Sequence, residues 1–91
     1  MAIRLSRHVE EKLSRELSRM GITRELIEET VRNPDEVLYD SVTGRYVAVK
    51  IERNLAVIYE REEEETFIIT AIYSSSLSDV IYRRKRSGRW I

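Results

Sequence analysis

The first part of the chain has the hydrophobic spacing of an α-helix. Its apolar residues recur three or four positions apart, at Val9, Leu13, Leu17 and Met20. Ser6 precedes them as an N-cap residue, because its hydroxyl can accept a hydrogen bond from an unpaired backbone N–H group of the first turn. Gly21 follows them, and glycine adopts the left-handed conformation of a helix C-terminus without a Cβ clash. The pattern predicts a first helix from Ser6 to about Arg19.

A second short helix follows directly. Thr23 is its N-cap, and the glutamates Glu25, Glu28 and Glu29 favour the positive N-terminal half of the helix dipole. Asn33-Pro34 ends the helix, because the residue before a proline is disfavoured in the helical conformation. We therefore expect two short antiparallel helices joined by a tight turn.

After Pro34 the hydrophobic period changes to the two-residue period of a strand. Four strands are predicted, over Glu36–Asp40, Arg45–Glu52, Leu55–Arg61 and Thr66–Tyr73. Arg53-Asn54 is the expected hairpin turn between the second and third strands, because asparagine tolerates positive φ. Ser76 or Ser78 begins a short last helix. The predicted fold is α+β, a single domain over residues 1–91, in which a two-helix hairpin packs on a four-stranded antiparallel meander with a short C-terminal helix.

The two faces of this sheet differ in polarity. A turn at Arg53-Asn54 places aliphatic residues on one face, namely Val47, Val49, Ile51, Ala56, Ile58, Ile69 and Ala71. We expect the two helices to cover this aliphatic face. The opposite face is mixed and carries Tyr46, Ala48, Lys50, Val57, Tyr59, Ile68, Thr70 and Ile72. Four covers suit the mixed face: the C-terminal segment, a second copy of the chain, a partner protein or a nucleic acid.

The composition of the chain limits the disulfides and metal sites that it can form. The chain has no cysteine and one histidine, which excludes a disulfide framework, a thiolate metal site and a multi-histidine metal site. We expect neither a metal nor a cofactor. Charged residues make up 35% of the chain and are mostly arginine and glutamate, which is typical of ion-pair-rich thermophilic proteins. No stretch approaches the roughly 20 apolar residues that span a bilayer, so a cytoplasmic location without membrane contact is expected.

Positive charge is concentrated near the C-terminal end, although the formal net charge of the chain is zero. Residues 81–91 hold five basic side chains and no acidic one. Guanidinium groups bind phosphate oxygens, and aromatic rings stack on unpaired bases. We therefore predict nucleic-acid binding by Arg83, Arg84, Arg86, Arg89 and Trp90. The same groups suit an acidic protein partner, and the ordinary alternative is a frayed, solvated terminus.

Residues suited to RNA cleavage are also present. Cleavage through the 2′-hydroxyl needs a base, charge stabilisation at phosphorus and an acid for the leaving oxygen. In such a site Lys50 stabilises the charge, and a tyrosine or His8 transfers the proton. Each residue has an ordinary structural interpretation as well, because strand tyrosines pack and a first-turn histidine hydrogen-bonds to the backbone. The run Glu62–Glu65 lacks the spaced oxygens and the glycine of a calcium loop, and indicates a solvated hairpin tip.

Several short motifs together resemble a known group of proteins. They are Ser6-Arg7-His8, Asn33-Pro34, the strand Gly44–Lys50 and the strand Thr70–Tyr73. In these motifs the chain resembles a small prokaryotic family of unknown function that is grouped with the RelE/ParE-type toxins and related endoribonucleases. The likeness covers most of residues 6–73 and implies a two-helix layer on a four-stranded antiparallel sheet. By position it implies catalytic roles for His8, Arg45, Lys50 and Tyr73, although Ser18–Ile22 departs from the pattern.

Two functions follow as hypotheses. The first is a toxin-like RNA-binding protein of a toxin–antitoxin system, extended to a metal-independent endoribonuclease, with an acidic antitoxin segment on the same surface. The second is a noncatalytic interaction module that keeps only the fold and pairs with a partner, or as a homodimer, through the open sheet face. RNA binding through several cations weakens steeply as salt rises, so a salt titration separates the two hypotheses.

Overall fold

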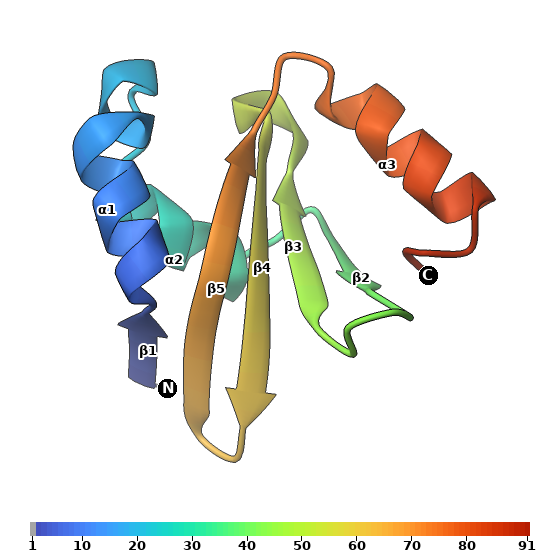
Figure 1. Ribbon diagram of the computed structural model, residues 1–91, viewed down its shortest axis with the longest axis horizontal. Coiled ribbons are helices and arrows are strands. Elements are labelled where there is room, and N and C mark those ends of the chain that lie inside the picture. The colour runs from blue at the N-terminus through green and yellow to red at the C-terminus, as the bar shows by residue number, and fades with distance from the viewer. Residues whose placement is uncertain (1) are drawn as a thin grey trace.

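The alternating strands and capped helices assemble into an α+β fold, whose computed structural model describes residues 2–91 (Figure 1). The α-helices in these residues are α1 (Arg7–Arg15), α2 (Arg24–Arg32) and α3 (Leu77–Arg86). One mixed sheet contains β1 (Ala2–Leu5), β2 (Glu36–Tyr39), β3 (Tyr46–Lys50), β4 (Leu55–Glu62) and β5 (Glu65–Tyr73). The 3-10 turns are Leu17–Met20 and Ile51–Arg53. The strands lie in the spatial order β1-β5-β4-β3-β2.

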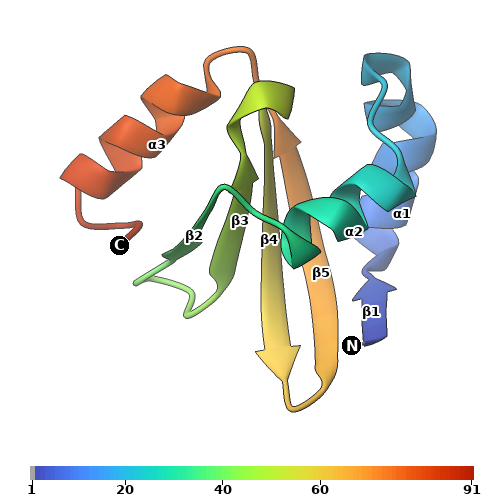
Figure 2. The ribbon, with the colours of Figure 1, turned by 180° about the vertical axis from the view of Figure 1, so that it is seen from behind.

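Both N-terminal helices begin at the predicted caps. The side-chain oxygens of Ser6 and Thr23 each accept a hydrogen bond from the backbone N–H three residues later, at 3.2 and 3.1 Å. Helix α1 is shorter than predicted, because it ends at Arg15 and the chain continues as a 3-10 turn that buries Leu17. Gly21 ends this turn with φ of 76°, the left-handed conformation expected of it. Figure 2 shows α2 running obliquely to α1, not antiparallel beside it.

Strand β1 is a feature that the sequence pattern does not predict. It pairs in parallel with β5, from Ala2 opposite Glu65 to Leu5 opposite Ile68. The predicted antiparallel meander of four strands is therefore wrong as a description of the whole sheet, which has a fifth strand at its edge. The N–H of Ser6 continues the pairing by donating a 2.9 Å hydrogen bond to the carbonyl of Ile68. This continuation fixes the start of α1 beside β5.

The β3–β4 hairpin turns differently from the prediction. A 3-10 turn, Ile51–Arg53, replaces the expected two-residue turn, and Asn54 follows it with a φ of 52°. The residue opposite Leu55 is therefore Lys50, whereas a turn at Arg53-Asn54 would place Glu52 there. The register shifts by two residues, so the side chains keep the faces that the sequence predicts for β3 and β4.

A β-bulge changes the faces within β5. Ile58 pairs with Thr70 and Tyr59 pairs with Ile68, which leaves Ile69 as the extra residue. The Oγ of Ser6 donates a 2.9 Å hydrogen bond to the carbonyl of Ile69. Because of this extra residue, Ala71 joins the mixed face, while Thr70 and Ile72 leave it.

Helices α1 and α2 cover the mixed face, which is opposite to the prediction (Figure 2). The helices and the turn between them contribute Val9, Leu17, Ile22, Ile27 and Val31 to this core, and the sheet contributes Ala48, Leu55, Val57, Tyr59, Ile68 and Ala71. The polar side chains of the face, Tyr46, Lys50 and Tyr73, lie only at strand ends. The centre of the face is thus apolar and rich in small side chains, which lets the helices approach closely.

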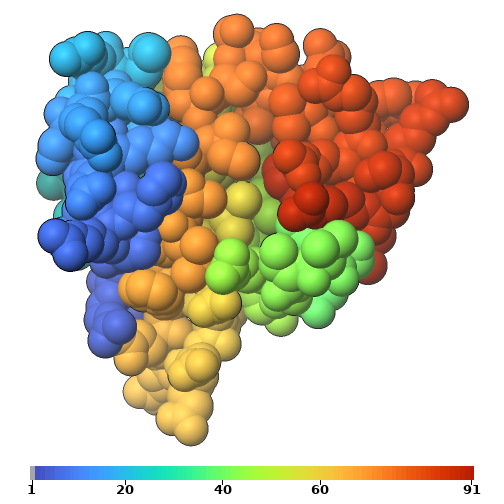
Figure 3. All heavy atoms as spheres, in the orientation of Figure 1, coloured from blue at the N-terminus to red at the C-terminus, as the bar shows by residue number. Residues whose placement is uncertain are grey.

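Helix α3 covers the aliphatic face over β2 and β3. Its core is formed by Leu38, Val47, Val49, Ala56, Leu77, Ile81 and Trp90. The cover is incomplete, because β5 lies at the surface between α1 and α3 (Figure 3). Within residues 2–91, no helix is long and apolar enough to cross a membrane.

Candidate functional site: an arginine surface on α3

The basic end of the chain forms the last turns of α3 and the segment that follows it. Leu77 and Ile81 anchor the helix in the core, and they leave Tyr82, Arg83 and Arg86 exposed on its outer side. The basic side chains lie in the last turn, where they complement the negative end of the helix dipole. The local structure therefore gathers cations at one end of one helix.

Residues 89–91 do not fray but pair with the edge of β2. The N–H of Tyr39 donates to the carbonyl of Ile91 at 2.8 Å, and the N–H of Ile91 donates back at 2.9 Å. The N–H of Ser41 donates to the carbonyl of Arg89, also at 2.8 Å. These bonds close an edge of the sheet and hold the basic segment in place.

Trp90 does not have the role predicted for it. Its side chain is 1% exposed and packs with Leu38 and Val47 beneath α3. Its Nε1 donates a long hydrogen bond of 3.4 Å to Oδ2 of Asp40. A ring buried in this way presents no face to a base, so Trp90 supports the arginines and does not itself stack on nucleic acid.

Asp40 is a residue of this region that sequence reasoning missed. Burial by itself would raise the pKa of its carboxyl group, but hydrogen bonds from the N–H groups of Thr43 and Val42 and the charged contact with Arg89 lower it to about 2. The Arg89 Nε atom lies 3.3 Å from the carboxylate. The sequence does carry a signal for this role of Asp40. An aspartate that precedes a turn, here the turn ending at Gly44, often accepts hydrogen bonds from the backbone N–H groups of that turn.

The arginines line a shallow hollow beside this buried aspartate. The hollow has a volume of about 410 Å³ and is lined by Val80, Arg83, Arg84, Ser87 and Arg89. No carboxylate is among these lining residues. We call Arg83, Arg84, Arg86 and Arg89 the arginine surface.

Neighbouring groups orient members of the arginine surface. The Arg84 guanidinium carbon lies 5.2 Å from the Trp90 ring centroid, a cation–π contact that holds the side chain in place. Arg86 donates a weak 3.4 Å hydrogen bond to the Tyr82 hydroxyl, and the exposed Arg83 makes no ion pair within residues 2–91. Planar guanidinium groups with unused N–H donors suit phosphate or carboxylate oxygens.

Lys50 and Tyr73 lie on the side of the sheet opposite to the arginine surface. Lys50 donates a 3.0 Å hydrogen bond to the carbonyl of Asn33, and its Nζ lies 3.8 Å from Glu29. Tyr73 is partly exposed at the same end of the sheet. Both residues pair with Leu55, so two strand spacings separate them, roughly 10 Å. The predicted convergence of Lys50 and the basic tail on one open face is wrong.

Arg45 and His8 lie elsewhere again. Arg45 precedes β3, at the end of that strand opposite Lys50, and its Nε lies 3.1 Å from Glu60. His8 is exposed in the first turn of α1, and its imidazole makes no hydrogen bond or ion pair within the described chain. The four residues proposed for catalysis therefore do not form one site.

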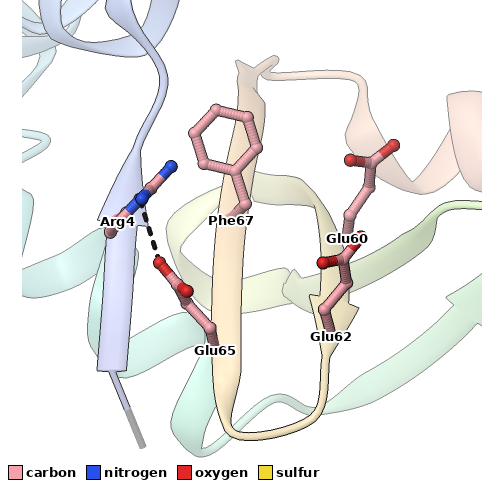
Figure 4. Close-up of a pocket in the computed structure, with 5 residues that line it drawn as sticks. All are labelled: Arg4, Glu60, Glu62, Glu65 and Phe67. Atoms are coloured by element: carbon pink, nitrogen blue, oxygen red, sulfur yellow. Dashed lines mark ion pairs between the residues drawn. The ribbon is translucent and has the colours of Figure 1, made fainter.

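The tip of the β4–β5 hairpin carries the opposite charge. A hollow of about 230 Å³ lies there, and Figure 4 shows the side chains that line it, Arg4, Glu60, Glu62, Glu65 and Phe67. The Arg4 guanidinium pairs with Glu65 at 3.0 Å and lies 5.4 Å from the Phe67 ring centroid. In the described part of the chain, no three His, Asp or Glu side chains are grouped to hold a metal ion. The carboxylates at this tip repel phosphate, so an anionic ligand is expected at α3.

Comparison of the chain with protein-family models, with curated proteins and with solved structures finds no match.

Proposed function

We propose that this protein binds RNA through the arginine surface. The observation that carries the proposal is the hollow on α3, which three arginines line without a carboxylate among them. Phosphate contacts from several guanidinium groups supply most of the affinity of nonspecific nucleic-acid binding. Because residues 89–91 are fixed to β2, part of this surface is held in place before the ligand arrives.

The proposal stops at binding and does not extend to cleavage. A nuclease site needs its proton-transfer groups and its cations around one phosphate. Lys50 donates its hydrogen bond to the carbonyl of Asn33, at the C-terminal end of α2. Arg45 lies opposite Asp40, but its guanidinium group pairs with Glu60 of β4. Neither residue is among those that line the hollow with Arg83.

We extend the proposal to a toxin-like role, which is supported by the motif resemblance and by the α+β arrangement of the elements. In that role, an acidic segment of an antitoxin-like protein competes with RNA for the arginine surface. Carboxylates and phosphates use the same fork of guanidinium donors, so one surface serves both ligands.

A salt titration of RNA binding tests the proposal. We expect the double variant Arg83→Ser/Arg86→Ser to bind single-stranded RNA about 10-fold more weakly than wild type at low salt. Its slope of log affinity against log salt should be smaller by roughly 1.4, because two phosphate contacts are lost. Fluorescence anisotropy with a labelled oligouridine measures both quantities.

A matched control removes the same charge elsewhere. Arg7 and Arg19 are exposed on the other side of the molecule, and Arg7→Ser/Arg19→Ser should retain the wild-type affinity and salt slope. Equal affinities of all three proteins, or no binding by wild type, would contradict the proposal.

A second candidate function is a noncatalytic interaction module, and the uncovered part of β5 favours it. Strand β5 lies at the surface between α1 and α3 (Figure 3), and Phe67 and Ile69 of β5 and Ile58 of β4 are only half-buried. An apolar strip of this kind suits a second copy of the chain. This candidate predicts a concentration-dependent dimer by light scattering that Phe67→Glu dissociates, and no salt-sensitive RNA binding. A wild type that stays monomeric at all accessible concentrations excludes the homodimer.

A further inference from the structure

Tyrosines form a row across three strands on the face that carries α1 and α2. Tyr39 pairs with Tyr46, and Tyr46 pairs with Tyr59, so the three side chains are direct neighbours. The ring centroids are 5.7 Å apart in both pairs, with an edge-on contact in the first and a stacked contact in the second. Each ring therefore restricts the next, and little conformational freedom remains to be lost on binding.

Helix α2 packs on the sheet beside the tyrosine row. Ile27 and Val31 belong to the same core as Ala48 and Val57, one row further along the strands. Tyr59 is buried at the inner end of the tyrosine row. The outer part of the row has no cover from the described residues.

Four exposed side chains lie here, and we call them the tyrosine strip: Tyr39, Tyr46 and Ile91 of the tyrosine row, and Val37 of the neighbouring row. Tyr39 and Tyr46 are 41% and 39% exposed. The Tyr39 hydroxyl lies 3.6 Å from the position that a Cβ atom would take at Gly44. The hydroxyl end of Tyr39 thus lies beside the β2–β3 turn, while part of the side chain stays exposed.

Arginines flank the tyrosine strip on two sides. Arg61 lies two residues beyond Tyr59 on β4, and side chains alternate along a strand, so it is on the same face as Tyr59. Burial raises the pKa of Tyr59, and the charge of Arg61 partly offsets that rise, so the two groups are electrostatically coupled. On the other side, Arg89, whose guanidinium group pairs with Asp40, belongs to the segment that pairs with Tyr39 and Ser41. The strip and the arginine surface therefore meet at the outer edge of β2.

We propose that the tyrosine strip stacks unpaired bases of the same single-stranded RNA whose phosphates the arginine surface binds. The inference rests on the proposed RNA-binding function and adds the ligand class, an unpaired strand that passes around the edge of β2. Aromatic side chains stack on any base, so the strip gives affinity without sequence readout. The flanking arginines favour a nucleic acid over a neutral protein surface at this position.

Two oligomers of equal length test the inference, an oligouridine and an abasic ribose-phosphate chain. Tyr39→Leu/Tyr46→Leu should bind oligouridine about 10-fold more weakly than wild type, because base–aromatic stacking is lost. Its affinity for the abasic oligomer and its salt slope should equal those of wild type, since no cation is removed. Tyr73→Leu, which removes a similarly exposed tyrosine at the far end of β5, should bind both oligomers like wild type.

The outcomes separate this inference from the function on which it rests. If wild type binds neither oligomer, the RNA-binding function fails, and the inference fails with it. If wild type binds both oligomers equally, or the tyrosine variant keeps full affinity for oligouridine, the inference alone is overturned. A variant that changes only the dimerisation constant also overturns it and assigns the strip to a second copy of the chain. Tyr39→Leu alone, with its fold checked by circular dichroism, provides a milder variant should the double substitution unfold.

Discussion

Replacing Trp90 with alanine is expected to lower the free energy of unfolding by about 4 kcal/mol, a large fraction of the stability of a domain of this size. The indole is 1% exposed and fills the space between α3 and the sheet, beside Leu38 and Val47. Its removal leaves a cavity, and Asp40 and Arg84 each lose a contact with the ring. Urea unfolding followed by circular dichroism measures the change.

The neighbouring residue provides the control. Ile91 is 68% exposed, and its contacts with β2 are made by its backbone, so Ile91→Ala should change the stability by less than about 0.5 kcal/mol. Similar midpoints for Trp90→Ala and wild type would show that the C-terminal segment is not packed in solution. That result would also remove the support of the arginine surface.

Acid should destabilise the protein through Asp40. Its pKa in the folded protein is about 2, below the ordinary value of 3.8, so the folded state binds this proton less readily than the unfolded chain does. The resulting stabilisation, about 2 kcal/mol, is complete above the ordinary pKa. It is lost as pH falls from about 4 toward 2, where the folded protein also takes up the proton. Unfolding free energies measured at several pH values between neutral and pH 2 report this loss.

Asp40→Asn isolates that contribution from the other carboxylates. Asparagine keeps an oxygen that can accept hydrogen bonds from Val42 and Thr43, but it has no charge for Arg89 and no proton to bind. We expect the variant to be less stable than wild type at neutral pH and to approach wild type in stability as pH falls. A difference between the two proteins that stays constant with pH would contradict the assignment of the low pKa to Asp40.

Local signals in the sequence predicted the elements well. Ser6 and Thr23 cap their helices as expected, because a hydroxyl at these positions forms its bond within one turn of chain. The meander strands and the last helix also lie where the two-residue period and the serines near residue 76 indicate. Strand β1 was missed because four residues give too short an alternation, and its partner β5 is remote in sequence.

The prediction of which sheet face α1 and α2 cover was wrong for a different reason. The sequence pattern overstates the polarity of the mixed face, because Tyr46 and Lys50 count equally with its apolar residues. In the structure these two residues lie at strand ends, where a long side chain reaches solvent or a helix terminus while the centre stays apolar. Polarity summed over a face therefore misleads when the polar residues lie at its rim.

The arginines of the candidate site were predicted from the sequence, but the surroundings that hold them in place were not. The cluster of arginines was visible as a run of charge, and α3 brings these residues to one surface. The burial of Trp90 depends on Asp40 and on pairing with β2, and no local pattern reveals contacts so distant in sequence. Tyr39 was not singled out either, because its exposure depends on where α2 ends.

The parallel pairing of β1 with β5 has a consequence for the order in which the molecule assembles. During synthesis β1 leaves the ribosome first, yet its partner is the last strand of the sheet to be made. Contacts between remote segments form slowly, because a long loop must close before they contribute. We expect the β2–β5 meander to organise first and to act as the template on which the N-terminal strand docks. The newly made β1 would then stay unpaired until β5 has been made, as an extended segment open to chaperones.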